Sequence, residues 1–275
     1  MTYASLLVAV DDSLESDSRL ELACDLANAF AAHLTGQCAG SIAPPLYDPL
    51  EGVLVGELLT LYRDLAEAEV ERARKRFADI VRTRDVESDW RGEVGLPSEA
   101  CLRAAQAADL VILGGRNPRA PYHAPDVADV LMACGRPVLV IPPTRVRNPI
   151  GEHALVAWKD CREARLALSA AIPLLRRAQG VTLYAIRSSE KGETVEGELA
   201  DVVRFLARHE IVAEPVIASR GQTSAGRQIL DEALARRAGL IVAGGYGHAR
   251  LREWALGGVT RDLIDDGTIC LCLAH

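Results

Sequence analysis

The sequence contains the same pattern twice, and this internal repeat limits the possible folds more than any other feature. The segment Leu7-Val-Ala9 recurs as Leu155-Val-Ala157, at an offset of 148 residues. The segment Ala108-Asp-Leu-Val-Ile-Leu-Gly-Gly115 recurs as Ala238-Gly-Leu-Ile-Val-Ala-Gly-Gly245, at an offset of 130. Self-similarity over such distances indicates two copies of one structural unit. We therefore predict two domains, residues 1–143 and residues 152–275, joined by a linker that contains prolines.

Each repeat alternates short apolar runs with segments of helical periodicity. Runs such as Leu6–Val10 and Leu110–Leu113 are typical of parallel strands that are buried on both faces. Between them, apolar residues return at the spacing of an amphipathic helix. In the first such segment these residues are Leu20, Ala23, Leu26, Ala27 and Phe30. Five strands alternating with four helices in each repeat predict an α/β fold with two tandem, doubly wound, five-stranded parallel sheets of Rossmann-like type.

A glycine-rich stretch follows the fourth predicted strand of the second repeat. The glycines are Gly244, Gly245, Gly247, Gly257 and Gly258. Without Cβ atoms they let backbone amides approach an anion closely, and a helix beginning near Val259 would direct its positive end to the same place. In a doubly wound sheet this turn and the turn after the first strand meet at one crevice. The residues alone leave two interpretations open, a cradle for a polyphosphate or tight turns between strands and helices.

At these positions the sequence resembles the universal stress proteins in their tandem form, over both repeats. The most specific match is Gly244-x-x-Gly247 followed after nine residues by Gly257. The resemblance implies a Rossmann-like, adenine nucleotide alpha hydrolase-like fold. It also implies that the two repeats pack as a pseudo-dimer through their last strands, Val138–Ile141 and Cys270–Leu273. Such a pairing would cover two apolar strands that would otherwise be open edges.

The same resemblance implies a bound cofactor, ATP or alternatively ADP or AMP, with or without Mg²⁺. In relatives that bind ATP the glycine loop holds the phosphates, and the ends of the first two strands hold the adenosine. The residues at the matching positions, with His248 added as a side chain that could touch a phosphate, form the predicted site. They are Ala157, Trp158, Lys159, Ile186, Gly244, Gly245, Gly247, His248, Gly257, Gly258, Val259 and Thr260.

Two departures from the family pattern fall within this site. Gly258 stands where the family has Ser or Thr, so that the nearest hydroxyl belongs to Thr260. Lys159 replaces the acidic residue that usually follows the first strand, with Asp160 next to it. The first change removes a hydroxyl that could contact phosphate. The second removes a carboxylate from the adenosine side and adds a cation, which either reaches a phosphate or remains solvated.

The corresponding loop of the first repeat departs further. Gly114 and Gly115 are retained, but Asn117-Pro118 and Ala124-Pro125-Asp126 replace the rest. Pro125 offers no amide donor, and an acidic residue in the first turn of the next helix would repel a phosphate. We therefore predict one nucleotide per chain, in the second repeat, with the first repeat as a structural partner.

Composition excludes several other classes of protein. A formal net charge of −7 leaves no basic excess for a nucleic-acid backbone. No apolar run approaches the roughly 18 residues of a membrane helix, and the N-terminus has no signal-peptide core. We therefore expect a cytoplasmic protein with neither nucleic acid nor membrane as a partner. The seven cysteines form no regular disulfide framework and have no zinc-ligand spacing, so no metal site is predicted.

Catalytic motifs are absent as well. The sequence has neither Gly-x-x-x-x-Gly-Lys-Ser/Thr nor Gly-x-Ser-x-Gly, and no histidine has a nucleophile at a recognisable spacing, so we predict no catalytic residue. The prediction is a stress-response regulatory protein that binds adenine nucleotide and acts through conformation or a regulatory protein partner, as an intramolecular pseudo-dimer or a homodimer. Two alternatives remain. One is a nucleotide-free module that binds a protein or small ligand, which Lys159 and Gly258 support; the other is a slow ATP hydrolase, for which no general base is evident.

Overall fold

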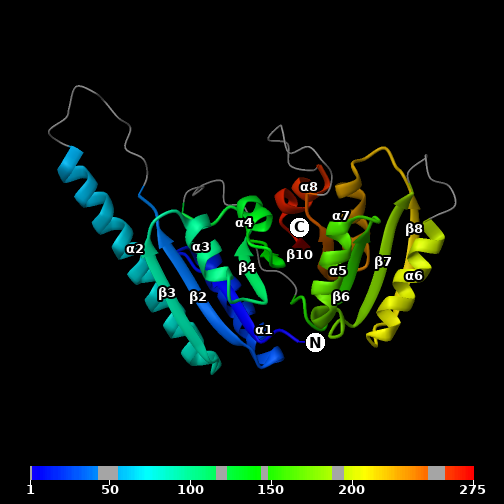
Figure 1. The fold of residues 1–275 in the computed structure, drawn as a ribbon, viewed down its shortest axis with the longest axis horizontal. Coiled ribbons are helices and arrows are strands. Elements are labelled where there is room, and N and C mark those ends of the chain that lie inside the picture. The colour runs from blue at the N-terminus through cyan, green and yellow to red at the C-terminus, as the bar shows by residue number, and fades with distance from the viewer. Residues whose placement is uncertain (1, 43–54, 116–122, 144–147, 188–194, 247–257) are drawn as a thin grey trace. The chain divides into compact units, whose positions relative to one another are not determined.

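A computed structural model describes residues 2–42, 55–115, 123–143, 148–187, 195–246 and 258–275 (Figure 1). The chain forms two compact units. The N-terminal unit is Ala4–Cys134, and the C-terminal unit is Gly135–His275 together with the first residues up to Tyr3. Tyr3 belongs there because its hydroxyl donates a hydrogen bond to the carbonyl of Ala170, at 2.6 Å.

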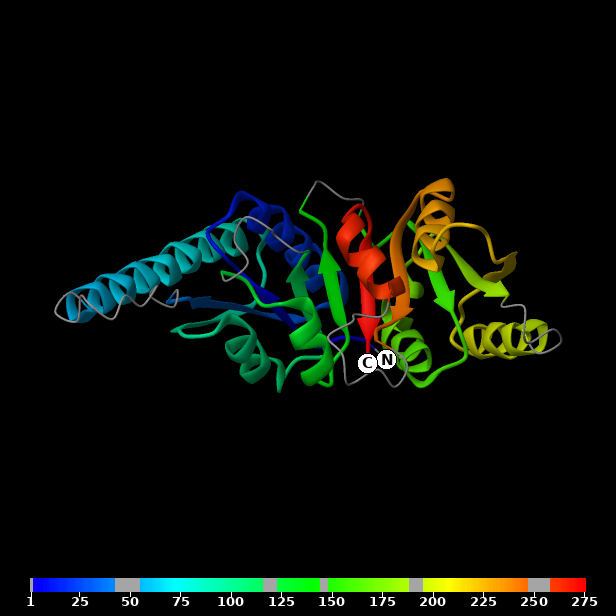
Figure 2. The same ribbon diagram turned by 90° about the horizontal axis from the view of Figure 1, so that it is seen from above.

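The N-terminal unit alternates strands and helices along the chain. Its described elements are β1 (Ser5–Ala9), α1 (Leu14–Phe30), β2 (His33–Gly40), α2 (Val55–Arg84), β3 (Ser88–Val94), α3 (Pro97–Ala105), β4 (Leu110–Gly114) and α4 (Val127–Ala133). The strands lie in the order β3-β2-β1-β4, and each neighbouring pair is parallel. Helices α1 and α2 cover one face, and α3 and α4 cover the other (Figure 2). The strand order therefore reverses between β1 and β4, where such sheets bind ligands.

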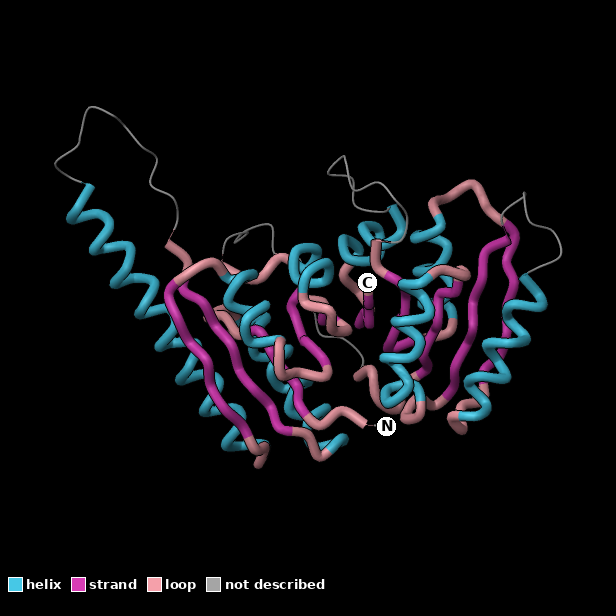
Figure 3. Tube along the Cα trace, viewed as in Figure 1, coloured by secondary structure: helices cyan, strands magenta, loops and turns pink. Residues whose placement is uncertain are grey.

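The C-terminal unit repeats this arrangement with one addition. Its described elements are β5 (Val138–Ile141), β6 (His153–Trp158), α5 (Arg162–Leu175), β7 (Gly180–Arg187), α6 (Val195–Arg208), β8 (Ala213–Ser219), α7 (Ala225–Ala235), β9 (Ala238–Gly244), α8 (Gly258–Asp266) and β10 (Cys270–Ala274). The strand order is β5-β10-β9-β6-β7-β8. All neighbours from β10 to β8 are parallel. The strands, magenta in Figure 3, run between helices on both faces, so their apolar residues are buried on two sides.

The added strand, β5, is the last strand of the first repeat. It pairs antiparallel with β10, the last strand of the second repeat, with Val138 opposite Leu273 and Val140 opposite Leu271. The predicted pairing of the two last strands is therefore confirmed. Because β5 is hydrogen bonded to β10, it belongs to the C-terminal unit. The boundary between the compact units therefore lies after Cys134 and not within the linker. The boundaries 1–143 and 152–275 describe the repeats of the sequence pattern and stay a prediction.

The two units differ most in the helix that follows their second strand. Helix α2 has 30 residues, whereas its counterpart α6 has 14. This difference accounts for most of the change in repeat offset from 148 to 130. Helix α2 is long but carries charged residues throughout its length. None of the helices in the described part of the chain is both long and apolar enough to cross a membrane.

The β5–β10 pairing predicts how the first repeat behaves by itself. In a fragment of residues 1–147, β5 loses its partner, and its buried side chains Leu139 and Val140 become part of an open strand edge. Because unpaired strand edges template association, we expect this fragment to dimerise or aggregate. In the full chain β5 is paired with β10, so we expect no association through this strand. Sedimentation velocity compares the two. A fragment that stays folded and monomeric would contradict the pairing.

Candidate functional site

The carboxyl ends of three strands meet at one edge of the C-terminal unit. Ala157 of β6 lies opposite Tyr184 of β7 and opposite Ala243 of β9. Because the three strands are parallel and in register, their last residues reach the same edge. Most of the predicted site residues are brought together there, namely Ala157, Trp158, Lys159, Ile186, Gly244 and Gly245, with Gly258, Val259 and Thr260 at the start of α8. Gly247, His248 and Gly257 lie outside the described residues.

A hydrogen bond connects the end of β9 with the first turn of α8. The amide of Tyr246 donates to Oγ1 of Thr260 at 3.3 Å. Thr260 is 4% exposed, so its hydroxyl is directed into the protein. Tyr246 has a φ of 55°, in the left-handed region that side chains other than glycine rarely adopt. The turn after β9 is therefore held in an unusual conformation against the helix that follows it.

The first two glycines of the loop have structural roles. A Cβ atom on Gly244 would lie 2.6 Å from the amide nitrogen of Ala164, at the start of α5, so only glycine fits this close packing. The amide of Gly245 already donates to the carbonyl of Ala274 at 2.9 Å. The carbonyl of Gly245 lies 3.1 Å from Nδ1 of His275. Neither the position of Gly244 nor the amide of Gly245 requires an anion to explain it.

The start of α8 is less crowded by the described part of the chain. Gly258 is exposed, and a Cβ atom placed on it would meet no atom of the described residues within 4 Å. The amides in the first turn of a helix have no partner within that helix, and the helix dipole makes this end positive. Gly258 and Val259 therefore provide the backbone donors that the described edge can offer to an anionic ligand.

The two charged residues that follow β6, Lys159 and Asp160, differ in their contacts. Lys159 is exposed. Asp160, its neighbour, accepts hydrogen bonds from Nε and Nη2 of Arg165, at 2.9 and 2.5 Å. The carboxylate of Asp160 is thus already paired and does not replace the acidic residue that Lys159 displaces.

The start of α5 already carries a negative charge. The pKa of Glu163 lies below its ordinary value, mainly because the carboxylate accepts from its own backbone amide, while burial opposes this and the Cys161 thiol and His275 add to it. A carboxylate in the first turn complements the dipole of α5. An anionic ligand is therefore better placed at α8 than at α5. Trp158 at the same edge is 8% exposed, and its buried indole nitrogen has no hydrogen-bond partner among the described residues.

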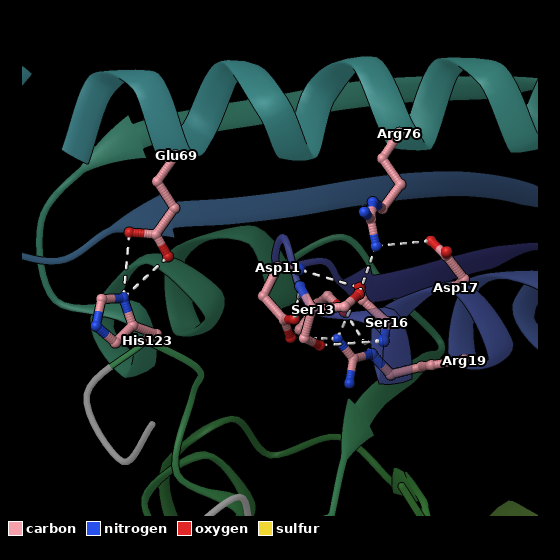
Figure 4. A network of polar contacts seen from close by, with 9 residues as sticks. Asp11, Ser13, Ser16, Asp17, Arg19, Glu69, Arg76 and His123 are labelled. Atoms are coloured by element: carbon pink, nitrogen blue, oxygen red, sulfur yellow. Dashed lines mark hydrogen bonds and ion pairs between the residues drawn. The ribbon is translucent and has the colours of Figure 1, made fainter. Parts of the chain in front are cut away.

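The corresponding edge of the N-terminal unit is filled by an arginine that sequence reasoning missed. Arg19 of α1 is 6% exposed, and its Nη2 donates to Oδ2 of Asp11 at 2.6 Å and to Oγ of Ser16 at 3.0 Å (Figure 4). Its Nε donates to the carbonyl of Ala9 at 2.8 Å. A Cβ atom on Gly114 would lie 2.1 Å from Nη1 of Arg19. The guanidinium therefore occupies the space between the ends of β1 and β4.

A signal for this arginine is present in the sequence. Arg19 lies one residue before Leu20 on the apolar face of α1, and the residue 148 positions later, Ala167, is a buried alanine. A charged residue at a core position in only one repeat indicates an internal partner. That partner is Asp11: burial would raise its pKa, but Arg19 and hydrogen bonds from Ser13 and Arg19 hold the pKa below its ordinary value.

A second contact fixes the segment that precedes α4. Nδ1 of His123 lies 3.1 and 3.2 Å from the two carboxylate oxygens of Glu69 on α2 (Figure 4). Glu69 is 6% exposed, and burial raises its pKa above the ordinary value although His123 opposes the shift. His123 lies in the first repeat's counterpart of the glycine loop. The residues directly before α4 are thus attached to α2 by a side chain for which the sequence predicted no role.

Neither edge has the ligands of a metal site in its described part. No group of three or more His, Cys, Asp or Glu side chains among those the structure describes is arranged to hold a metal ion. What the C-terminal edge offers is the first amides of α8, the Lys159 ammonium group and the half-buried apolar ends of β6 and β7 at Ala157 and Ile186. This set suits an anion attached to a flat apolar group.

Comparison with known proteins identifies the architecture. No protein-family model matches the sequence, and no curated protein matches it either. A solved universal stress protein from Archaeoglobus fulgidus superposes with a TM-score of 0.76, covering 98% of this chain and 95% of that one at 16% identity. This chain has the universal stress protein fold. The fold predicted from the glycine motif is therefore confirmed, including its tandem form.

Two further structures agree with this assignment. A protein of unknown function from Pseudomonas aeruginosa superposes with a TM-score of 0.60 at 18% identity, covering 99% of this chain and 92% of its own. A chain from the same organism, provisionally assigned as a universal stress protein, superposes with a TM-score of 0.56 at 18% identity and covers 99% of this chain and 93% of its own. All three comparisons thus agree on the fold over nearly the whole chain.

The buried Arg19–Asp11 pair predicts a pH-dependent loss of stability. Removing one member of a buried ion pair typically costs about 3–5 kcal/mol, so Arg19→Ala should strongly destabilise the N-terminal unit. Without Arg19, burial would raise the pKa of Asp11 above its unfolded value. The penalty should then be larger near pH 7, where Asp11 is charged, than near pH 4. Chemical denaturation at both pH values measures this difference.

The control replaces both partners. Arg19→Leu combined with Asp11→Asn leaves no buried charge, and we expect it to recover most of the lost free energy of unfolding. An Arg19→Ala penalty that does not change with pH, or a double variant as unstable as the single one, would show that the pair is not what stabilises this edge.

Proposed function

We propose that this chain is a cytoplasmic stress-response regulatory protein that binds ATP, or another adenine nucleotide, in its C-terminal unit. The observation that carries the proposal is the contrast between the two edges. At the C-terminal edge, the end of β9 is connected to an open helix start through Tyr246 and Thr260. At the N-terminal edge, the Arg19 guanidinium fills the space beside Gly114, and the start of α4, the counterpart of α8, is capped by the carboxylate of Asp126, which accepts from the amides of Ala128 and Asp129.

The phosphate end of the ligand would bind at the start of α8. The first amides and the positive end of a helix make a ready anion site, and no described residue lies within 4 Å of a Cβ atom placed on the exposed Gly258. The Lys159 ammonium group adds a cation near the end of β6. Mg²⁺, where it accompanies the nucleotide, would be held mainly by phosphate oxygens and water, as is usual for this ion.

The adenosine would bind at the ends of β6 and β7. Ala157 and Ile186 are partly exposed there, and both are apolar. Ala157 has a small side chain, which leaves room for a base next to the strand. The paired Asp160 contributes no free carboxylate, so we expect recognition of the base and ribose to depend on backbone groups and apolar contact.

The proposal assigns one nucleotide to each chain. In the N-terminal unit, Asp11 and Arg19 satisfy one another, and His123 is bound to Glu69. A nucleotide there would have to displace a buried ion pair. We infer that this unit is a structural and regulatory partner, and that the protein signals to a protein partner through conformation.

A second candidate is a nucleotide-free module that binds a protein or a small ligand. It is favoured by the amide of Gly245, which belongs to the predicted phosphate loop but already donates to the carbonyl of Ala274. Native mass spectrometry after incubation with ATP separates the two candidates. One nucleotide per chain supports the first, two oppose the single-site assignment, and none favours the second candidate.

Gly258 provides the most direct test of the phosphate position. Gly258→Asp introduces a carboxylate into open space, and an acidic residue in the first turn of a helix is neutral or stabilising by about 0.3–1 kcal/mol. We therefore expect an unchanged or slightly raised melting temperature together with a loss of ATP affinity on the order of 100-fold. Isothermal titration measures the affinity.

The matched control is Gly258→Asn, which has nearly the same shape without the charge. It should retain most of the affinity if charge repulsion is the cause. An Asp variant that binds ATP as well as the parent would place the phosphates elsewhere. Equal losses in both variants would indicate that the backbone conformation, and not the charge, matters at this position.

Substitutions of Lys159 test whether its side chain faces the phosphates or the adenosine of the ligand. If its ammonium group contacts a phosphate, Lys159→Ala should weaken ATP roughly tenfold, as for a lost hydrogen bond to a charged group, and leave adenosine unaffected. If it merely replaces a useful carboxylate, Lys159→Asp should strengthen adenosine binding. Equal affinities for the parent and both variants would show that Lys159 lies outside the site.

A further inference from the structure

A network of polar side chains lies at the amino ends of β6 and β7, at the far end of these strands from the candidate site. His153 is the first residue of β6 and lies opposite Gly180, the first residue of β7. Thr182 follows Gly180 by two residues, so the side chains of His153 and Thr182 lie on the same face of the sheet. Nε2 of His153 lies 2.9 Å from Oγ1 of Thr182. A Cβ atom on Gly180 would lie 2.9 Å from Nδ1 of His153, so glycine leaves room for the imidazole ring.

The Thr182 hydroxyl has a second partner, Arg236, at the end of α7. Nη1 of Arg236 donates to Oγ1 of Thr182 at 2.8 Å and to Oε2 of Glu214, in β8, at 2.6 Å. Nε of Arg236 donates to Oε1 of Glu232 at 2.5 Å. A guanidinium group donates hydrogen bonds and accepts none. The Thr182 oxygen therefore accepts from Arg236, and the hydrogen of the hydroxyl remains to be donated to another group.

The acceptor of that hydrogen determines the protonation state of His153. Of the partners that the structure describes for this hydroxyl, only His153 can accept a hydrogen bond. Thr182 is fully buried, so its hydroxyl does not donate to solvent, and a buried hydroxyl without an acceptor is costly. Nε2 is therefore the unprotonated nitrogen, and the imidazole is neutral with its proton on Nδ1.

Protonation of Nε2 would reverse these conditions. The new N–H group would point at an oxygen that already accepts from Arg236, and the Thr182 hydrogen would lose its acceptor. The charged groups of this network are Arg236 and Glu232 on α7 and Glu214 on β8. Burial and the positive charge of Arg236 lower the pKa of His153 below its ordinary value, while Glu214 opposes the shift.

We propose that His153 makes a pH-sensitive side-chain contact between β6, β7 and α7, which forms while the imidazole is neutral and is lost when it is protonated. Protonation breaks the hydrogen bond from Thr182 and adds a second positive charge near Arg236. The same two strands carry Ala157 and Ile186 at their other ends, so acid weakens the unit that contains the candidate site. The proposal does not depend on nucleotide binding.

The direction of the pH dependence follows from the lowered pKa. In the unfolded chain His153 takes up a proton near its ordinary pKa of about 6.5, whereas in the folded chain it does so only at lower pH. Between these two pKa values the unfolded state binds more protons, so acidification favours unfolding. The stability that His153 contributes is complete above about pH 6.5 and is lost as the pH falls through the pKa of the folded state.

Nitrogen NMR of the imidazole in the full chain tests the protonation state. At neutral pH we expect the proton on Nδ1, and a titration should give His153 a pKa below that of a histidine in an unstructured peptide. Thr182→Val removes the hydroxyl that stabilises the neutral ring and leaves Arg236 its two carboxylate partners, so the pKa of His153 should rise. Thr182→Ser keeps the hydroxyl, and the pKa should stay close to that of the parent. A proton on Nε2 in the parent, or an unchanged pKa in the valine variant, would overturn the proposal.

The effect on stability is measured with His153→Gln. Glutamine provides an amide oxygen that can accept from Thr182 but does not titrate. Chemical denaturation of both chains at about pH 7.5 and about pH 5.5 spans the range in which histidine changes its charge. We expect the parent to lose more stability on acidification than the glutamine variant, because all other titrating groups are common to both chains. Equal losses would show that His153 is not a pH-sensitive contact, whichever nitrogen carries the proton.

Discussion

Parallel pairing around one central strand in each unit positions both the buried ion pair and the candidate site of this protein. In each unit the first strand of the repeat pairs in parallel with the second and the fourth. Register then brings the turns that follow these strands to a single edge. The Arg19–Asp11 pair, the open start of α8 and the Tyr246–Thr260 hydrogen bond all occur at such an edge because of this pairing.

The two units use equivalent edges in opposite ways. In the N-terminal unit a buried guanidinium satisfies a carboxylate, a hydroxyl and a strand carbonyl, so the edge is complete without a ligand. In the C-terminal unit the position equivalent to Arg19 is the small, buried Ala167, and the position equivalent to Asp11 is the exposed Lys159, so no such pair forms there. The edge that is closed by an ion pair in one repeat therefore lacks that pair in the other.

The glycines of the loop show that one motif can have several physical causes. Gly244 is required because α5 packs closely on the end of β9. Gly245 is hydrogen bonded to β10 on both its amide and carbonyl sides. Gly258, by contrast, has no described residue within 4 Å of the place where a Cβ atom would lie. The spacing of glycines therefore identifies the loop, and the neighbours of each glycine separate packing from binding.

The sequence by itself determined the two repeats and the order of strands and helices, because buried parallel strands and amphipathic helices have distinct apolar periodicities. The pairing of the last strands followed from the family resemblance and from the need to cover two apolar strand edges. The sequence also predicted which turns lie at one edge, since in this topology the carboxyl ends of particular strands must meet. The tertiary structure alone decided the partners of Arg19, Glu69 and His123. Glu69 and His123 belong to elements far apart in the sequence, and Arg19 bonds the end of β1 and the turn after it. Apolar periodicity carries no information about such polar partners.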